Sequence, residues 1–176
     1  VYVKIFKIVL TGGPCAGKTT AIKTIKNHLE ENGIPCLIVP ETATELLPNI
    51  QCFEMRDVIE FQRLVMKRQL TKEYDTINYA KRNYSNYDKV VILYDRGLFD
   101  GLAYLETEQT FRKMLSSFMK DDITSLNGYD LVIDLLSLAT CKSNEYNLSN
   151  EVRKESVDLA TILDNKTSNA WANHYN

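Results

Sequence analysis

The segment that most constrains the fold is TGGPCAGKTT, residues 11–20, which directly follows the apolar run IFKIVL. It holds three glycines and one proline, residues that helices and strands rarely accept in their interiors. From Gly12 to Thr19 the residues fit the spacing GxxxxGK[ST], between a run with strand character and a run with helical periodicity. A loop in this context wraps consecutive backbone N–H groups around phosphate oxygens. The sequence therefore predicts a polyphosphate site at the first strand–helix junction.

Each position of this loop has a chemical task in such a site. The glycines allow positive φ and close approach of the backbone to a ligand, and the following helix adds the positive end of its dipole. Lys18 is expected to reach the β- and γ-phosphates, and the Thr19 hydroxyl to ligate Mg²⁺. Cys15 is interpreted as a small filler, because phosphoryl transfer on such a loop needs no thiol. The predicted binding residues for ATP or GTP are Gly12, Gly13, Pro14, Cys15, Ala16, Gly17, Lys18, Thr19 and Thr20. The alternative is a tight turn without a ligand.

The rest of the chain alternates apolar runs with helical periodicity. Four strands are predicted, at residues 5–10, 35–40, 90–95 and 129–136. The intervening helices are predicted at residues 18–32, 42–47, 57–83, 99–105, 110–119 and 151–172. Strands that are apolar almost throughout, separated by helices, are typical of a parallel sheet covered on both faces. We therefore predict one α/β domain of three layers over residues 1–176, with residues 137–150 forming a polar loop that is a candidate lid.

Helical spacing also predicts which side chains face the core. In the long helix the apolar positions at this spacing are Val58, Phe61, Val65, Leu70 and Ile77. In the last helix the candidates for burial are Val152, Leu159, Ile162 or Leu163, Ala170 and Trp171.

Two carboxylates follow predicted strands. Asp95 ends the run VVILYD, and Glu41 follows the run CLIVP. Because parallel strands end at the same edge of a sheet, both should converge on the phosphate loop. Asp95 is the predicted magnesium-side carboxylate, with a turn residue or helix cap as the alternative. Glu41 is a candidate general base for an acceptor hydroxyl, with capping of the next helix as the alternative.

Three further polar residues are candidates for the site. Arg96 either contacts an anionic substrate or pairs with nearby acids. Gln62, on the long helix, is a candidate for recognition of the acceptor. Arg153 follows the polar loop, where a guanidinium can stabilise the transferring phosphoryl group; an ordinary surface arginine is the alternative. The candidate catalytic residues are therefore Lys18, Glu41, Asp95 and Arg153.

Bulk composition argues against several other functions. The formal net charge is −2, which gives no broad attraction to nucleic acid, and no nucleic-acid partner is expected. The four cysteines have no CxxC spacing, which disfavours a zinc or redox site and favours a reducing, cytoplasmic compartment. No apolar run approaches the roughly 20 residues that span a bilayer, so no transmembrane segment is expected.

Several segments together resemble a known family. They are KIVLTGGPCAGKTT, VPETATELL, EFQ, YDRGLFDGLAYL, YDLVIDLLS and EVRKESVDLATILDNKTSNAWANHY. The chain is similar over nearly its whole length to the P-loop domain shared by bacterial nicotinamide-riboside kinase modules and eukaryotic TRPL-translocation-defect proteins. VPETAT and the last helix resemble the eukaryotic branch more closely.

This resemblance implies a kinase-like P-loop fold. In it, Glu41 and the pair Asp95 and Arg96 flank the phosphoryl acceptor, and Arg153 belongs to the lid region. The bacterial kinases carry an arginine where this chain has Thr44, so nicotinamide riboside itself is not implied. The eukaryotic branch implies GTP binding and an acidic phospholipid or protein partner. In that branch the last core strand would lie beyond residue 176, and a triphosphate-tunnel domain often follows.

Two classes of function are compatible with these residues. The first is a magnesium-dependent kinase that transfers the γ-phosphoryl of ATP or GTP to a small hydroxyl acceptor such as a nucleoside. The second is a regulatory module whose nucleotide state changes its contacts with a protein or phospholipid. Both use the same nucleotide site, and they differ in the role of Glu41.

Overall fold

The computed structural model of the chain describes residues 3–47, 58–118, 128–137 and 157–176. Its centre is a parallel sheet with the order β2-β3-β1-β4. The strands are β1 (Lys4–Thr11), β2 (Cys36–Val39), β3 (Lys89–Asp95) and β4 (Leu131–Asp134). In the register of the central pair, Leu10 lies beside Asp95, so the loops after β1 and β3 leave the sheet side by side.

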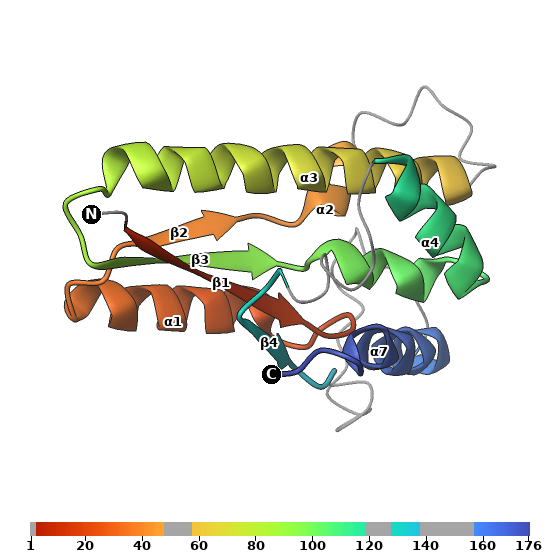
Figure 1. Cartoon of the computed structure of the whole chain (residues 1–176). Coiled ribbons are helices and arrows are strands. Elements are labelled where there is room, and N and C mark those ends of the chain that lie inside the picture. The colour runs from red at the N-terminus through yellow and green to blue at the C-terminus, as the bar shows by residue number, and fades with distance from the viewer. Residues whose placement is uncertain (1–2, 48–57, 119–127, 138–156) are drawn as a thin grey trace.

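Helices cover both faces of this sheet (Figure 1). The first, α1 (Lys18–Glu31), packs on one face, and the long helix α3 (Val58–Asn83) lies on the other. Along β3 the side chains of Val91 and Leu93 belong to the core on the α1 side, whereas Val90, Ile92 and Tyr94 belong to the other core. Burial on both faces explains why the strand sequence is apolar almost throughout. The predicted three-layer α/β fold is confirmed.

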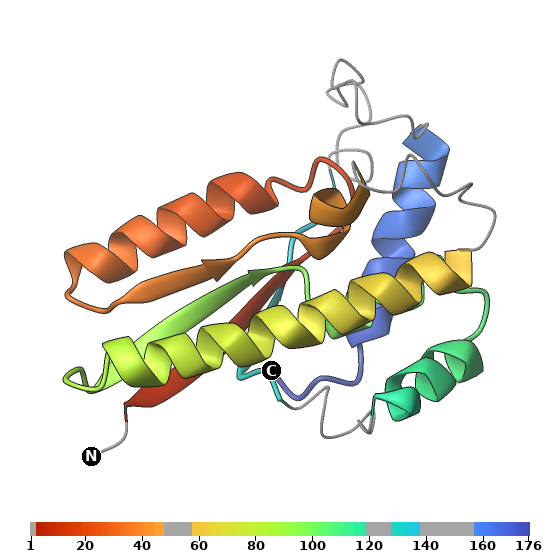
Figure 2. The ribbon, with the colours of Figure 1, turned by 90° about the horizontal axis from the view of Figure 1, so that it is seen from above.

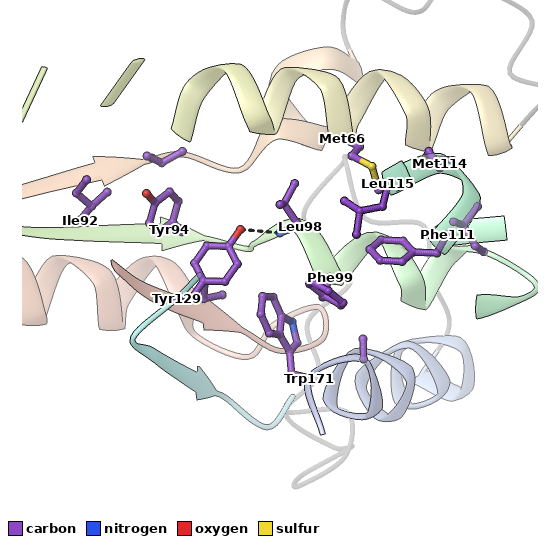
Figure 3. Packing of buried hydrophobic residues seen from close by; sticks show 14 of the residues in the cluster. Met66, Ile92, Tyr94, Leu98, Phe99, Phe111, Met114, Leu115, Tyr129 and Trp171 are labelled. Carbon is purple, nitrogen blue, oxygen red and sulfur yellow. Dashed lines mark hydrogen bonds between the residues drawn. The ribbon is translucent and has the colours of Figure 1, made fainter. Parts of the chain in front are cut away.

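Four further elements surround the carboxyl edge of the sheet. They are α2 (Thr42–Leu46), the 3₁₀ helix η2 (Leu98–Tyr104), α4 (Glu108–Ser117) and α7 (Val157–Trp171). As Figures 1 and 2 show, α7 runs across the carboxyl end of the strands, and it packs against η2. Trp171 anchors it there, with ring centroids 5.5 Å from both Phe99 and Tyr129 (Figure 3).

The apolar face predicted for α3 is only partly its buried face. Its fully buried residues are Gln62, Met66, Gln69, Glu73 and Ala80, whereas Val58 is 52% exposed. Leu70 and Ile77 are only partly buried against the core, and Phe61 and Val65 are half-buried. Three polar side chains therefore occupy the buried face. Two of them, Gln69 and Glu73, are joined by a hydrogen bond of 3.0 Å, which offsets the cost of their burial.

The last helix differs from prediction in the same way. Ala170 and Trp171 are buried as predicted, but Leu159 and Ile162 are 45% and 51% exposed. Leu163, the alternative to Ile162, is half-buried. The buried face instead includes Ala160, Asp164 and Thr167. Val152 lies outside the described residues, as does nearly all of the predicted polar loop. None of the helices in the described part of the chain has the length and apolar character that crossing a bilayer requires.

Candidate functional site

The glycine-rich loop connects the end of β1 to the first residue of α1, as the spacing predicts. Gly17, immediately before α1, has φ of 80°, and Cys15 has φ of 59°. Both values lie in the left-handed region, which glycine adopts freely and other residues rarely do. A Cβ added at Gly17 would meet nothing within 4 Å, so space does not require glycine at this position. The backbone conformation does, because φ is positive.

Gly12 also has a positive φ, of 130°, and both Gly12 and Gly13 have a second reason to be glycine, which is close packing. A Cβ added at Gly12 would lie 2.1 Å from the carbonyl oxygen of Leu135. A Cβ added at Gly13 would lie 2.7 Å from Oδ1 of Asp164. The first half of the loop is thus held between the segment after β4 and helix α7. The close approach of backbone that these glycines allow is therefore to the protein itself.

Lys18 folds back over the loop from the start of α1. Its Nζ donates hydrogen bonds to the carbonyl oxygens of Gly12 (3.0 Å) and Gly13 (3.1 Å). Burial, and then repulsion from Arg96, lower the pKa of Lys18 to about 8, although the nearby acids oppose that shift. An ammonium group held in this way lacks an anion close enough to compensate its burial fully. A polyphosphate in the loop would supply that anion.

Asp95 lies beside this lysine at the end of β3. Its Oδ1 is buried, and none of the described residues hydrogen-bonds to it. Burial, followed by repulsion from Glu41, raises the pKa of the Asp95 carboxyl group above its ordinary value, while Lys18 and Arg96 act against this rise. A buried carboxylate oxygen without a partner is costly unless a cation or donor binds it. Asp95 therefore fits the role of a ligand for a divalent cation.

Thr19, the other predicted metal ligand, is the second residue of α1 and lines the same cavity as Asp95. Hydroxyl and carboxylate oxygens are the ligands that Mg²⁺ prefers. Among the described residues there is no group of three or more His, Cys, Asp or Glu side chains that would form a closed metal cage. The residues present thus fit an ion that takes most of its ligands from phosphates and water, as Mg²⁺ does.

Arg96 has an unusual conformation and a dense set of partners. Its φ of 69° turns the chain sharply after β3. Its Nε donates to Oε1 of Glu41 at 2.6 Å, and its Nη1 donates to Oδ1 of Asp100 at 3.0 Å. Burial lowers the pKa of Arg96, but Tyr104, Asp100 and Glu41 raise it by more than burial lowers it. The guanidinium therefore stays charged. Arg96 therefore pairs with nearby acids, one of the two alternatives that the sequence left open.

Glu41 lies at the start of α2 but does not cap it, because its side chain makes no cap hydrogen bond. Its carboxylate instead accepts hydrogen bonds from Arg96 and, at 2.7 Å, from the hydroxyl of Thr44. Burial raises the pKa of Glu41, yet Arg96 and Thr44 together outweigh it and bring the pKa below its ordinary value. Glu41 is therefore ionised at neutral pH, and it lies beside Arg96 at the sheet edge.

A cavity of about 1000 Å³ joins these groups. Its polar end is lined by residues 14–20 of the loop together with Glu41, Asp95 and Arg96. Its other end lies between α3, η2 and α4, and its apolar lining there includes Phe61, Val65, Met66, Leu98, Phe111 and Met114. From α7, Leu163 and Lys166 also line it. One cavity thus joins the phosphate-binding loop to a mostly apolar region, and its total volume is in the range of small-molecule sites.

Gln62 also lines this cavity. It is only 6% exposed, and among the described residues no hydrogen bond involves its amide. A Cβ added at Gly101 would lie 3.2 Å from Oε1 of Gln62, so the glycine leaves room for the amide. The side-chain amide of Gln62 is therefore accessible from the cavity and has no partner among the described residues, so a ligand or water can bind it there.

The structure thus brings Lys18, Glu41, Asp95, Arg96 and Gln62 together around one cavity. Arg153, the remaining candidate, lies outside the described residues. The sequence analysis missed two buried acids, Asp100 and Asp164. Asp100 follows Arg96 by four residues, a spacing that indicates an ion pair in a helical turn. Asp164 gave no such signal, because its partners are distant in sequence.

Comparison with known proteins places the chain in a family. Residues 7–176 match the model of a family described as AAA domain. A comparison with curated proteins gives no match. The family match covers nearly the whole chain, and it agrees with the parallel sheet and with the glycine-rich loop between β1 and α1. The chain therefore belongs to the AAA domain family and is a P-loop nucleotide-binding domain.

Proposed function

We propose that this domain binds ATP or GTP with Mg²⁺ and transfers the γ-phosphoryl group to a hydroxyl of a small acceptor such as a nucleoside. The observation that carries the proposal is the single cavity that runs from the phosphate loop, past Glu41, Asp95 and Arg96, into a mostly apolar chamber. A protein that only binds a nucleotide needs the first part of this cavity. A second chamber next to the γ-phosphate end suits a reaction with an acceptor.

At the nucleotide end the chain supplies positive charge and backbone donors. The first N–H groups of an α-helix have no partner within the helix. Together with the positive end of the helix dipole, those of α1 favour a bound anion. Lys18 gains a compensating anion when phosphates bind, in place of the two carbonyl oxygens it contacts now. Thr19 and Asp95 would hold Mg²⁺. When bound, this ion supplies charge neutralisation of the β- and γ-phosphates.

At the acceptor end, Glu41 and Arg96 form a fixed pair. Glu41 is ionised, so it can accept a hydrogen bond from the acceptor hydroxyl and receive its proton as the oxygen attacks phosphorus. Arg96 keeps the carboxylate oriented through the 2.6 Å bond and adds positive charge where negative charge spreads over the transferring group. Asp100 in turn holds Arg96 from the opposite side.

Gln62 offers an N–H donor and a carbonyl acceptor side by side in the apolar chamber. This pair matches the edge of a nucleobase or another planar ring that carries an amide. The aromatic rings of Phe61 and Phe111, which line the same chamber, suit a flat ligand. These features favour a nucleoside over an aliphatic alcohol as the acceptor. The role of Arg153 in stabilising the transferring phosphoryl group stays a prediction.

The test has two steps. A thermal-shift series with ATP, GTP and their diphosphates, each with Mg²⁺, identifies the nucleotide, because a ligand of the native state raises the melting temperature with concentration. Purified nucleosides are then assayed for phosphorylation. In Glu41→Gln we expect turnover to fall by about 100-fold, within the usual range for a general base, while nucleotide affinity is kept.

Glu45→Gln is the matched control. Glu45 lies four residues further along, in α2, and its partly exposed carboxylate pairs with Arg68 and Lys72. Such pairs contribute little to stability, so this variant should retain turnover. Equal turnover in Glu41→Gln and the unsubstituted chain would exclude the proposed role of Glu41.

Nucleotide binding without turnover of any acceptor would instead favour a regulatory module. That outcome agrees with the resemblance to TRPL-translocation-defect proteins and predicts nucleotide-dependent binding to acidic phospholipid vesicles. In that case Glu41→Gln should barely change the function. In either role we propose a cytoplasmic protein, since the free thiol of Cys36 suits a reducing compartment.

A further inference from the structure

A buried acid on α7 contacts the backbone of the phosphate-binding loop. Asp164 is 1% exposed, and its Oδ1 accepts a hydrogen bond of 2.8 Å from the N–H of Gly13. The N–H of Ser137, just after β4, lies 3.2 Å from each of the two Asp164 oxygens. Ser137 also donates its hydroxyl proton to the carbonyl oxygen of Pro14. One carboxylate therefore joins the loop, the end of β4 and the last helix.

These contacts fix the part of the loop that no secondary structure holds. Gly13 lies after the last residue of β1 and before the first residue of α1, so its N–H has no ladder or helix partner. A hydrogen bond to a carboxylate is among the stronger kinds. Asp164 is close enough that a Cβ on residue 13 would overlap its side chain, at 2.7 and 2.9 Å. The loop and the acid are thus fitted to each other.

The helix that carries Asp164 is itself held firmly. Seven residues further along, on the same face, Trp171 packs against Gly97, where an added Cβ would lie 2.8 Å from the indole ring. The indole Nε1 donates to Oδ2 of Asp100 at 3.3 Å. Two helical turns, or about 10 Å, separate these anchor points. Asp164 therefore acts on the loop from a fixed element.

We propose that Asp164 is a positioning residue that holds the loop in its phosphate-binding form. By bonding to Gly13, it keeps the first half of the loop against α7, so that the loop holds one conformation before the nucleotide arrives. Preorganised donors bind an anion more tightly than donors that must first be ordered. The inference rests on the nucleotide binding proposed above, but not on transfer to an acceptor.

The experiment compares three variants of the whole chain by calorimetric titration with ATP and GTP in the presence of Mg²⁺. Asp164→Ala removes both acceptors of the carboxylate. Asp164→Asn keeps one oxygen for Gly13 and turns an N–H group toward Ser137, so its effect should be smaller. Asp158→Asn removes the same charge from an exposed position in the first turn of the same helix, where it serves as the control.

We expect Asp164→Ala to weaken binding of the nucleotide by about tenfold or more, which corresponds to about 1.4 kcal/mol, and Asp158→Asn to leave it unchanged. A ¹⁵N-glycine-labelled sample gives an independent readout, because the chain has only seven glycines. In Asp164→Asn the amide peaks of Gly12 and Gly13 should shift, and those of distant glycines should not.

The outcomes separate this inference from the proposed function. A lower melting temperature for Asp164→Ala with unchanged nucleotide affinity would show a purely structural role and overturn the inference alone. Unchanged positions of the Gly12 and Gly13 amide peaks in Asp164→Asn would also overturn the inference alone. Failure of the unsubstituted chain to bind ATP or GTP would overturn the proposed function and this inference together.

Discussion

Replacement of Asp100 by alanine should be among the most destabilising changes in this domain. The side chain of Asp100 is 4% exposed, and it accepts four hydrogen bonds. The donors are the Thr11 hydroxyl at 2.6 Å, Arg96 Nη1 at 3.0 Å, the Gly97 N–H at 2.8 Å and Trp171 Nε1 at 3.3 Å. These groups come from β1, the turn after β3 and α7, so one carboxylate joins three parts of the fold.

The size of the effect follows from these contacts. Removal of one partner of a buried ion pair costs about 3–5 kcal/mol, because the other charge is left buried. Arg96 keeps its bond to Glu41, which favours the lower end of this range, but three neutral donors also lose their acceptor. We therefore expect a loss of about 3–5 kcal/mol in the free energy of unfolding. For a chain of this size that corresponds to a fall of about 6–20 °C in melting temperature.

Urea-induced unfolding measures this loss directly. The midpoint should fall, and the slope with urea concentration should stay the same if the native fold is kept. Asp88→Ala is the control, since this exposed acid lies just before β3 and its substitution should cost less than about 0.5 kcal/mol. A loss below about 1 kcal/mol in Asp100→Ala would refute the hydrogen-bond network described for this residue.

Four more predictions concern the same site. Gly97→Ala should cost about 1–3 kcal/mol of unfolding free energy, because its Cβ would lie 2.8 Å from the ring of Trp171; a stability equal to that of the unsubstituted chain would contradict this packing. With the pKa of Lys18 at about 8, nucleotide affinity measured by calorimetry should be constant below pH 8 and weaken by up to about tenfold per pH unit above it, since phosphates favour the charged lysine. The same lowered pKa means that, between pH 8 and 10.5, the unfolded chain binds more protons than the folded chain. This lysine therefore makes the nucleotide-free fold more stable as pH rises through that window, whereas nucleotide affinity falls. Asp95→Asn should raise the Mg²⁺ concentration needed for half-maximal nucleotide binding without weakening metal-free binding; an unchanged Mg²⁺ requirement would exclude Asp95 as a ligand.

The elements and the phosphate loop were predictable because their signals are local. The loop is a fixed spacing between a strand and a helix, and the runs before Asp95 and Glu41 are apolar on both faces. Parallel pairing then brings the ends of neighbouring strands to one edge, which explains why these two acids could be placed near Lys18. The 2.6 Å bond between Arg96 and Glu41, 55 residues apart, shows how closely these strand ends meet.

The buried polar side chains were not predictable from periodicity. On α3, Gln69 accepts a hydrogen bond from the hydroxyl of Thr42 at 2.5 Å, and Glu73 accepts one from the hydroxyl of Tyr129 at 2.6 Å. Their partners lie 27 and 56 residues away. An apolar pattern cannot show where a polar residue finds a distant partner. For the same reason the predicted buried face of α7 included Ala170 and Trp171, which are buried, and Leu159, which is exposed, but not Asp164.

The central claim is that a nucleotide triphosphate binds at the junction of β1 and α1. Its most direct test is calorimetric titration of the unsubstituted chain and of Lys18→Ala with ATP and with GTP, each in the presence of Mg²⁺. We predict that at least one nucleotide binds the unsubstituted chain, and that Lys18→Ala weakens this binding by about tenfold or more through loss of the ammonium group. Equal affinity of the two proteins for the nucleotide, or no binding by either, would contradict the account.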